Sequence, residues 1–455
     1  MRHVDPAQEA ASWAASSVPE HLSARSIREP WLGAVVVLVA LLPLIWPPPA
    51  WLLVPCFLAV LTLRAAALIR WTDHHDPEPA RWPRLTVLLP VYREPSVIPD
   101  LAAAMRALDY PSLEIVLLVE EDDLETQAVL PVWPFQVLVV PDGRPRTKPR
   151  AVNFGLLNTS GEIVVVYDAE DRPAEDQPKR AVARLLSDSR CAVVQGVLAC
   201  DHDGSLVTRL WHLEYCVLFR GVLPFLSRFG LPFLLGGTSQ YFRRDVLEAV
   251  GAFDAHSVTE DADLAVRLAR AGYTSSVVLS VTGEEAPVTV TAWIKQRSRW
   301  IKGWLQTVLV HGLLPKAIDR WTPPMRLRDR VALAVQLPVQ LLCLASHPVG
   351  MAVAFNDPHG PLAVLLFAGY ALTIVVFMVA AIRAGRSPWD AFALPLYAFL
   401  HTAAMAIAVV ELVVCPSRWS KTEHGVVRNR PTQHLVDPAF PQTACCDQVL
   451  ARVRR

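Results

Sequence analysis

Five apolar stretches, placed at the two ends of the chain, constrain the fold more than any other feature of the sequence. Trp31–Trp46 and Trp51–Ile69 precede a more polar middle region, and Val331–Phe355, Pro361–Ile382 and Ala391–Cys415 follow it. A helix needs about 20 apolar residues to span a bilayer. The last four stretches have that length, whereas the first is slightly short. Buried core helices are the alternative, but five such blocks around one polar region fit a bilayer better, so we expect a multi-pass membrane protein.

The composition of the chain excludes two other classes of protein. Hydrophobic residues make up 53% of the chain and charged residues 19%, which is too apolar for a disordered chain. Lysine plus arginine and aspartate plus glutamate number 43 each, so the net charge is zero. Proteins that bind nucleic acids usually carry a basic excess, and we expect no nucleic-acid partner here.

The placement of arginines indicates how the apolar stretches are oriented, since basic residues favour the cytoplasmic side of a membrane. Arg25 and Arg28 precede the first stretch, and Arg64 and Arg70 lie at the end of the second. This pattern predicts a hairpin with both ends in the cytoplasm, and a middle region on the cytoplasmic face of the inner (plasma) membrane. Three further spans would leave the basic C-terminal tail outside. We therefore expect one later stretch to be re-entrant or interfacial, or a boundary to be misplaced.

These features divide the chain into six segments. The predicted segments are an N-terminal cytoplasmic tail (1–30), a transmembrane hairpin (31–70), an α/β domain (84–300), an interfacial helix region (301–330), C-terminal transmembrane helices (331–415) and a C-terminal tail (416–455). The interfacial helix is expected over Trp300–Ile318, an apolar stretch in which Lys302, His311 and Lys316 are interspersed.

Short apolar runs alternate with helical patterns in the middle region. The expected strands are Leu85–Leu89, Glu114–Val119, Gln136–Val140 and Ile163–Tyr167, and the expected helices are Ile98–Leu108 and Ala151–Leu157. This alternation favours a mainly parallel sheet covered by helices. Ligands of such sheets bind at the carboxyl ends of the strands, and two of these strand ends are followed at once by clustered acids.

The acids after the fourth strand have the pattern of a metal site. In Asp168-Ala169-Glu170, alternate carboxylates at the end of a buried strand can point into one crevice. Hard oxygen ligands of this kind suit Mg²⁺ or Mn²⁺, with a diphosphate completing the coordination. A solvated acidic turn is the alternative, because an acidic tetrapeptide is common.

Five motifs in order give the middle region a recognisable identity. They are the strand end Leu89–Glu94, the acidic run that begins at Glu120, Asp168-Ala169-Glu170, Thr259-Glu260-Asp261, and Gln296-Arg297-Ser298-Arg299-Trp300. The region from Thr86 to Trp300 thereby resembles the family 2 glycosyltransferases, in particular their membrane-embedded, cellulose-synthase-like branch. The resemblance implies a GT-A-type, Rossmann-like nucleotide-sugar domain.

The resemblance also assigns roles to single residues. Pro90, Tyr92 and Glu94 stand where the family contacts the nucleotide, and Glu120 and Asp122 stand where it holds the uridine. The metal motif of the family falls on Asp168 and Glu170. Two departures are present: the paired aspartates after the second strand are Glu120-Glu121 here, and Glu170 replaces an aspartate. The choice between Glu170 and Asp171 as metal ligand stays open.

The chemistry that the resemblance implies is an inverting transfer, in which an acceptor hydroxyl displaces the nucleoside diphosphate from the sugar. Asp261 stands at the position of the base, and Thr259 and Glu260 would orient its loop. The alternative is an acidic first turn of a helix that Thr259 caps. Lys148 would neutralise the diphosphate.

The Gln-x-x-Arg-Trp motif is assigned to the acceptor and the diphosphate. Arg299 would bind diphosphate oxygens, Trp300 would stack on an acceptor sugar, and Gln296 would hydrogen-bond sugar or phosphate. A membrane-interface anchor is the alternative for this basic, aromatic segment.

The first expectation for function is a membrane-embedded enzyme that transfers a sugar from a nucleotide sugar, with UDP as the expected nucleotide, to a growing polysaccharide or glycan. A single-sugar transferase acting on a lipid-linked acceptor is the second. A receptor or adaptor that no longer catalyses is the third, and the retained carboxylates argue against it. A glycosidase with two carboxylates would not explain the ordered motifs. The sugar, the acceptor and any accessory subunits are left open.

Overall fold

The computed structural model describes residues 6–28, 50–72, 76–130, 133–200, 202, 204–313 and 324–416. The first predicted span, Trp31–Trp46, and the basic tail from residue 417 onward lie outside the described residues.

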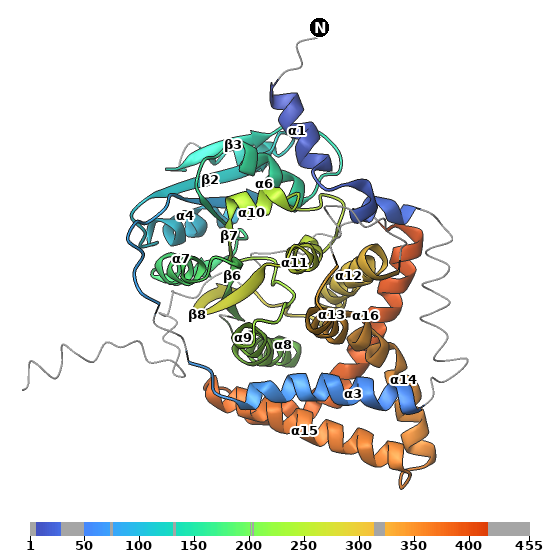
Figure 1. The fold of residues 1–455 in the computed structure, drawn as a ribbon. Helices are drawn as coiled ribbons and strands as arrows, with labels where there is room; N and C mark the ends of the chain where they lie inside the picture. The colour runs from blue at the N-terminus through green and yellow to red at the C-terminus, as the bar shows by residue number, and fades with distance from the viewer. Residues whose placement is uncertain are drawn as a thin grey trace, which may run out of the picture.

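An eight-stranded sheet forms the centre of the middle region (Figure 1), in the order β3-β2-β1-β4-β7-β6-β8-β5. Its strands are β1 (Leu85–Val91), β2 (Leu113–Glu120), β3 (Gln136–Val140), β4 (Ile163–Val166), β5 (Arg172–Pro173), β6 (Cys191–Cys200), β7 (Gln240–Arg243) and β8 (Thr274–Glu284). Strands β3, β2, β1 and β4 are parallel neighbours, and so are β6 and β8. Strand β7 is antiparallel to its neighbours β4 and β6, and β5 is antiparallel to β8. The predicted mainly parallel sheet is confirmed, and all four expected strands lie in it.

Helices cover both faces of this sheet (Figure 1). The helices of the domain are α4 (Ile98–Arg106), α5 (Leu124–Gln127), α6 (Lys148–Leu157), α7 (Gln177–Ser187), α8 (Leu206–Val217), α9 (Leu223–Arg228), α10 (Arg244–Ala249), α11 (Glu260–Arg270) and α12 (Val290–Val308). Side chains of β1 alternate between the faces, as a strand requires. Val87 and Leu89 pack with α4 and α7, whereas Leu88 packs with α6.

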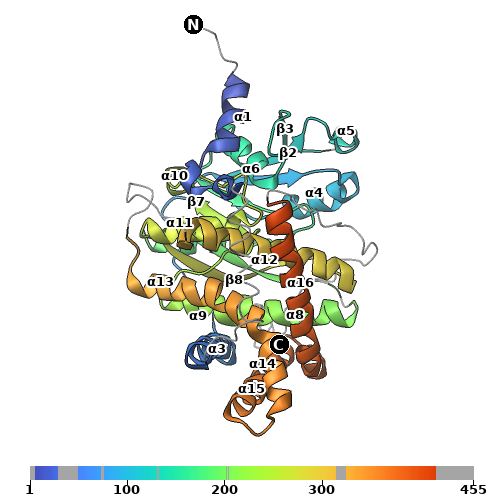
Figure 2. The same cartoon turned by 90° about the vertical axis from the view of Figure 1, so that its right-hand side faces the viewer.

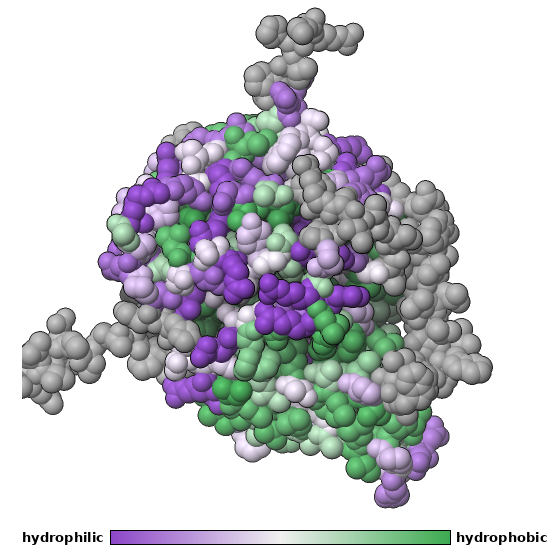
Figure 3. Space-filling view, viewed as in Figure 1, coloured by the Kyte–Doolittle hydropathy of each residue, from purple (hydrophilic) through white to green (hydrophobic). Residues whose placement is uncertain are grey.

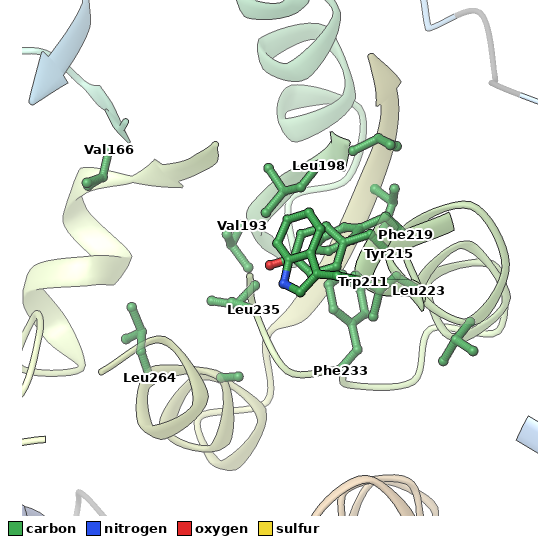
Figure 4. Close-up of a cluster of buried hydrophobic side chains, with 14 of the residues drawn as sticks. Val166, Val193, Leu198, Trp211, Tyr215, Phe219, Leu223, Phe233, Leu235 and Leu264 are labelled. Carbon is green, nitrogen blue, oxygen red and sulfur yellow. The ribbon is translucent and has the colours of Figure 1, made fainter. Parts of the chain in front are cut away.

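The core on the face of the sheet where Leu88 packs is rich in aromatic side chains, among them Trp211 and Tyr215 of α8 and Phe219 just after it (Figure 4). Trp211 and Tyr215 stack with their ring centroids 3.7 Å apart, and Tyr215 in turn contacts Phe219 at 5.1 Å. This packing fixes α8 against β6 and therefore fixes the side chains that α8 presents to the edge of the sheet.

The N-terminal segment, expected as a tail, folds onto the domain in its described part. Helix α1 (Pro6–Ser16) packs on α6, and Asn153 of α6 donates hydrogen bonds to the carbonyl oxygens of Ala14 and Phe253. Asp254 accepts hydrogen bonds from the hydroxyl of Ser23 and the backbone nitrogen of the next residue. The contacts join the start of the chain to the loop before α11.

The helices outside the domain are α3 (Ala50–Ala65), α13 (Leu327–Ala334), α14 (Gln340–Asn356), α15 (Pro361–Arg383) and α16 (Leu394–Val414). Of these, α3, α14 and α15 lie at one end of the molecule, below the domain in Figure 1, whereas α13 and α16 lie beside the domain. Three stretches of described helix are long and apolar enough to cross a membrane: Leu327–Asn356, Pro361–Arg383 and Pro388–Val414. The surface at this end is apolar, whereas the surface of the α/β domain is largely polar (Figure 3). This division fits the prediction of a membrane end and a polar domain.

Helix α16 runs beside α12 of the domain (Figure 2), so the last apolar stretch is covered on one face by protein. The fully buried ammonium of Lys302 lies 3.0 Å from a carboxylate oxygen of Glu411, and Gln306 donates a hydrogen bond to the carbonyl of Pro416. The boundary expected at residue 300 falls inside α12. The described part of the expected interfacial helix, up to residue 313, continues α12 and packs against α16 rather than forming a separate element.

Candidate active site

Four strands of the sheet end at one edge and border a single cavity of about 830 Å³. Strands β1, β2 and β4 are parallel, and β8 runs in the same direction because two antiparallel pairings, β4 with β7 and β7 with β6, separate it from β4. Acids that end or follow these strands line the cavity: Glu94, Glu120, Asp168 and Glu284. The arrangement matches the expectation for ligand sites of parallel sheets.

The cavity brings together predicted site residues from Pro90 to Trp300, which are 210 positions apart in the sequence (300 − 90). Of the residues predicted for the site, Asp122 does not line it. The lining includes Pro90, Tyr92, Glu94, Glu120, Lys148, Asp168, Glu170, Thr259, Glu260, Asp261, Gln296, Arg299 and Trp300.

Lys148, at the start of α6, pairs with the first acid of the predicted metal motif. Its ammonium lies 2.5 Å from a carboxylate oxygen of Asp168 and donates a hydrogen bond of 2.8 Å to the carbonyl of Gly237. Burial disfavours the charged form of the lysine, but Asp168 and Glu260 outweigh it and raise the pKa of Lys148 above its usual value. Lys148 is therefore a fixed cation among the carboxylates.

The structure separates the two acids between which the sequence left the second metal ligand open. Glu170 lines the cavity, whereas Asp171 is fully buried and does not. One carboxylate oxygen of Asp171 accepts hydrogen bonds from the backbone nitrogen of Asp168 and the hydroxyl of Thr238. Burial and the neighbouring Asp168 raise the pKa of Asp171 well above its usual value. Asp171 thus holds the loop on which Asp168 and Glu170 are presented.

The carboxylates at this edge have the donor chemistry of a site for Mg²⁺ or Mn²⁺. Asp168 and Glu170 offer oxygen ligands to the same cavity. Among the described residues, however, no three His, Cys, Asp or Glu side chains are arranged to hold a metal ion by themselves. The residues present fit a divalent cation whose remaining ligands are phosphate oxygens of a bound nucleotide.

The acids after β2 take separate positions. Glu120 lies at the cavity with its carboxylate 3.3 Å from the buried guanidinium of Arg150, and burial raises the pKa of Glu120 to about 7 against the effect of that arginine. Asp122 instead pairs with Arg146 at 2.6 Å and accepts a long hydrogen bond of 3.5 Å from the hydroxyl of Tyr92. Asp122 can act on the cavity through Arg146 and Tyr92, which both line it.

The Thr-Glu-Asp motif lies at the N-terminus of α11. Asp261 accepts a hydrogen bond of 2.8 Å from the backbone nitrogen of Ala262. Its removal from bulk water and the adjacent Glu260 raise the pKa of Asp261 to about 7. Gly237, with a φ of +86°, passes close by: a Cβ on this residue would lie 3.4 Å from a carboxylate oxygen of Asp261. Asp261 thus has the titration range that a general base needs.

The alternative expectation that Thr259 caps α11 is wrong. Its hydroxyl makes no capping hydrogen bond, and among the described residues this buried oxygen has no hydrogen-bond partner. The reason is packing, because Gly303 of α12 lies directly against the side chain of Thr259. The contact ties the loop that carries Asp261 to α12.

Helix α12 presents Gln296, Arg299 and Trp300 to the cavity. Gln296 accepts a hydrogen bond of 3.2 Å from the indole nitrogen of Trp211. The guanidinium of Arg297 lies 4.5 Å from the ring centroid of Trp300, so this cation packs over one face of the indole. Arg299 lies among Glu260, Asp261 and Asp168, which act on it electrostatically.

Sequence reasoning missed three acids of the cavity, Glu214, Glu284 and Glu285. Glu284 ends β8, and burial together with Asp171 and Asp168 raises its pKa well above the usual value. A Glu-Glu pair after an apolar strand is the same signal that singled out Asp168, so Glu284 could have been found. Glu214 of α8 carried no such signal.

Glu214 is the centre of a polar network where the domain meets the apolar helices. Arg297 donates two hydrogen bonds to its carboxylate, of 3.1 and 2.8 Å, and the hydroxyl of Tyr397 on α16 donates a third of 2.9 Å. Trp293 donates to that hydroxyl in turn, at 2.8 Å. Partial burial opposes the charge of this carboxylate, but Arg297 and His401 outweigh it and lower the pKa of Glu214 to about 2. Glu214 is thus held as a compensated anion.

Beyond this network the same cavity continues between the apolar helices α3, α14 and α15. We call this part the apolar half of the cavity. Its lining includes Leu53, Phe57, Leu344, Val353, Leu362 and Leu366. A single space therefore extends from the carboxylates at the edge of the sheet to side chains of α14 and α15, which belong to helical stretches long enough to cross a membrane.

Comparison with known proteins adds to this geometry. Residues 83–303 match the family model described as "Glycosyltransferase like family 2". A probable glycosyltransferase, YdaM of Bacillus subtilis, is 27% identical over 238 residues, which are 50% of this chain and 56% of that protein. The beta-monoglucosyldiacylglycerol synthase of Synechocystis is 25% identical over 416 residues, or 84% of both chains. The catalytic subunit of a UDP-forming cellulose synthase from Xanthomonas axonopodis is 26% identical over 54% of this chain and 35% of its own length.

The fold of this chain resembles that of a solved glycosyltransferase along most of both chains. The mannosyltransferase PcManGT of Pyrobaculum calidifontis, solved in complex with GDP-Man and Mn²⁺, shares 22% identity and a TM-score of 0.52 with this chain. The likeness covers 78% of this chain and 98% of that one. The predicted GT-A-type, Rossmann-like fold is confirmed.

Proposed function

We propose that this chain, whose residues 83–303 match the model of glycosyltransferase family 2, is an enzyme that transfers a sugar, with inversion, from a UDP-sugar to a hydroxyl of a membrane lipid. The observation that carries this proposal is the single cavity that joins Asp261 to the apolar half between α3, α14 and α15. A lipid acceptor needs both ends of such a space, because its head group must reach the base while its hydrocarbon chains stay in apolar surroundings.

In the proposed transfer, Asp261 takes the proton of the acceptor hydroxyl. The acceptor oxygen forms a new bond to the anomeric carbon from the face opposite the leaving group. The bond between that carbon and the diphosphate oxygen breaks, and its electron pair leaves with the nucleoside diphosphate. A raised pKa near 7 leaves Asp261 ionised in part at neutral pH and basic enough to accept the proton.

Two cations of the chain favour the leaving group. Lys148 and Arg299 line the cavity beside Asp168 and Asp261, where they would neutralise charge that develops on the diphosphate. Mg²⁺ or Mn²⁺, held by Asp168 and Glu170 with phosphate oxygens, would supply further charge stabilisation at the leaving diphosphate. Glu120, which ends β2 and lines the same cavity, is proposed to hold the uridine.

The comparisons support a lipid acceptor without naming it. The relative aligned along 84% of both chains is named as a synthase of a glucosylated diacylglycerol. Extension of a polysaccharide remains a second candidate, because Gln296, Arg299 and Trp300 have the pattern typical of processive members, and other relatives are named as cellulose and poly-beta-1,6-N-acetyl-D-glucosamine synthases.

The proposed location is the inner membrane, with the glycosyltransferase domain in the cytoplasm. Helices that can cross a bilayer support the membrane association, and arginines at the domain end of α3 support the orientation. Nucleotide sugars would then reach the carboxylates from the cytoplasm, and the acceptor would reach them from the bilayer.

The test is a transfer assay with the purified full chain in lipid nanodiscs. Labelled nucleotide sugars are offered one at a time with Mg²⁺ or Mn²⁺, and the lipid fraction is separated by chromatography and analysed by mass spectrometry. A lipid that gains one sugar supports the proposal. Nucleoside diphosphate release that accompanies a polymer of many sugars, with no labelled lipid, would favour the polysaccharide candidate.

A further inference from the structure

Arg64 is the one charged side chain that α3 contributes to the cavity in the described part of the chain. It is half-buried, and among the described residues its guanidinium makes no hydrogen bond or ion pair. Glu214, Cys343 and Tyr370 lie within electrostatic range. An arginine in such surroundings is costly unless an anion compensates it.

Glu214 does not supply that compensation by itself. Its carboxylate already accepts two hydrogen bonds from Arg297 and one from Tyr397. The pair of Glu214 and Arg297 is therefore neutral, and Arg64 leaves this part of the cavity with an excess positive charge. His347 and His401, which also line it, do not supply an anion.

The surroundings of Arg64 change character along the cavity. On one side lies the network of Glu214 and Arg297, which leads to Trp300 and Asp261. On the other side lies the apolar half, for example Phe57, Leu344 and Leu366. Arg64 is within electrostatic range both of Glu214 and of Cys343 on α14 and Tyr370 on α15, so it borders both parts of the lining, as the phosphate of an amphiphile lies between its head group and its hydrocarbon chains.

From this position we propose that the acceptor is a phospholipid whose hydroxyl-bearing head group is attached through a phosphate, and that Arg64 binds this phosphate. The hydrocarbon chains would lie in the apolar half, and the head-group hydroxyl would extend past Glu214 and Arg297 toward Asp261. A guanidinium is suited to the task because its planar fork matches two phosphate oxygens. This inference rests on the proposed lipid acceptor and narrows it from any lipid to a phosphate-bearing one.

The experiment compares two acceptors with the same acyl chains in micelles of a phosphate-free polyoxyethylene detergent. Phosphatidylglycerol carries its hydroxyls beyond a phosphate, and glucosyldiacylglycerol carries them without one. The full chain is supplied with the nucleotide sugar found in the donor screen, and sugar incorporation into each lipid gives kcat/KM. We expect at least a tenfold preference for phosphatidylglycerol.

Substitutions then ask whether Arg64 causes this preference. Arg64→Gln should lower kcat/KM for phosphatidylglycerol at least tenfold, mainly through KM, and should change the value for glucosyldiacylglycerol little. Arg64→Lys keeps the charge without the fork and should give an intermediate preference. Arg228→Gln, at an exposed arginine of α9 that does not line the cavity, should behave as the unaltered enzyme.

The deciding quantity is the ratio of the two kcat/KM values. An unchanged ratio in Arg64→Gln overturns the inference, as does equal use of both lipids by the unaltered enzyme, and either result leaves the lipid acceptor itself standing. If Arg64→Gln is inactive with both lipids, the ratio in Arg64→Lys decides in the same way. Absence of sugar on both lipids, together with release of nucleoside diphosphate and incorporation of the sugar into a polymer, would instead overturn the proposed function.

Discussion

The ammonium of Lys148 lies 2.5 Å from a carboxylate oxygen of Asp168. The first acid of the proposed metal motif is thereby paired with a cation that belongs to the chain itself. A divalent cation that binds Asp168 must compete with this lysine, whereas a diphosphate that arrives with the metal offers Lys148 a new anionic partner.

This competition predicts that the enzyme binds Mn²⁺ weakly without nucleotide and more tightly with it. Lys148→Met removes the competing charge, so it should strengthen Mn²⁺ binding to the free enzyme but weaken binding of the nucleoside diphosphate. Isothermal titration calorimetry measures both affinities. Lys179→Met is the control, because Lys179 pairs with Asp109 at an exposed site outside the cavity. Weaker Mn²⁺ binding in Lys148→Met would contradict the competition.

Asp261→Asn is expected to lower kcat by about 10²–10⁴-fold, the usual contribution of a positioned general base. The amide has nearly the shape of the carboxyl group, so nucleotide affinity should stay as it was. Turnover is followed by release of nucleoside diphosphate, and nucleotide affinity by calorimetry. Asp100→Asn, at an exposed position of α4, is the matched control. Full turnover in Asp261→Asn would remove the base assignment.

The pH dependence of kcat/KM should report the same carboxylate. Burial and Glu260 raise the pKa of Asp261 to about 7, so the base is protonated below that pH. Activity should be present above pH 7 and fall by up to tenfold per unit as the pH drops below it. Burial also raises the pKa of Glu120 to about 7. A Glu120→Gln variant separates the two, since it should keep the acid limb if Asp261 causes it.

Gly303→Ala tests whether α12 positions the catalytic loop. Alanine normally favours a helix over glycine by about 1 kcal/mol, but a Cβ at residue 303 would overlap the side chain of Thr259. We expect kcat to fall by at least tenfold although no side chain of the cavity is removed. Gly312→Ala is the control, because a Cβ there would meet its nearest atom at an ordinary 3.9 Å. Equal activity of both variants would show that the contact does not position Asp261.

The buried pair of Arg267 and Asp263 predicts an effect on stability. The two side chains, at most 4% exposed, lie 2.7 Å apart on α11, and His311 approaches the same carboxylate at 2.7 Å. Burial opposes the charge of Asp263, but Arg267 and His311 outweigh it and lower the pKa of Asp263 to about 2. Arg267→Met leaves this anion without its main partner and should cost about 3–5 kcal/mol of unfolding free energy.

Denaturant unfolding in detergent, followed by tryptophan fluorescence, measures that loss. Arg81→Ala is the control, since its ion pair with Glu162 is exposed and such pairs contribute little. A loss in Arg267→Met no larger than that in Arg81→Ala would mean that the buried pair is not stabilising.

The strands that begin the sheet could be predicted because each is a short apolar run with a clear end. Ile163–Val166 is followed by Asp168, and Leu113–Glu120 ends in an acid, so the carboxylates of the cavity were visible in the sequence before the fold was known. Glu284 also stands at the end of an apolar strand, but the four expected strands end with Ile163–Tyr167, so this later acid is not among the predicted residues. Local pattern was sufficient for all of these positions.

Other features depend on packing between distant segments and had no local signal. Thr259 precedes the acidic first turn of α11, and this pattern predicts a helix cap. In the structure its side chain packs against Gly303, which lies 44 residues later in the sequence (303 − 259). Arg64 lies near the end of an apolar stretch and indicates its cytoplasmic side, but in the structure α3 directs it to a cavity formed with α14 and α15. In both cases the position of a second helix decides the role, and the sequence of the first helix does not encode it.

Helix α12 is joined to α16 by the pair of Lys302 and Glu411 and by the hydrogen bond of Trp293 to Tyr397. The helix that carries Arg299 and Trp300 is thus mechanically connected to one that can cross a bilayer. A change in bilayer thickness that tilts α16 would be transmitted to the reaction centre as a displacement of these side chains. If the proposed function holds, we therefore expect turnover to change with the thickness of the bilayer, so that the membrane would regulate the reaction as well as supply its substrate.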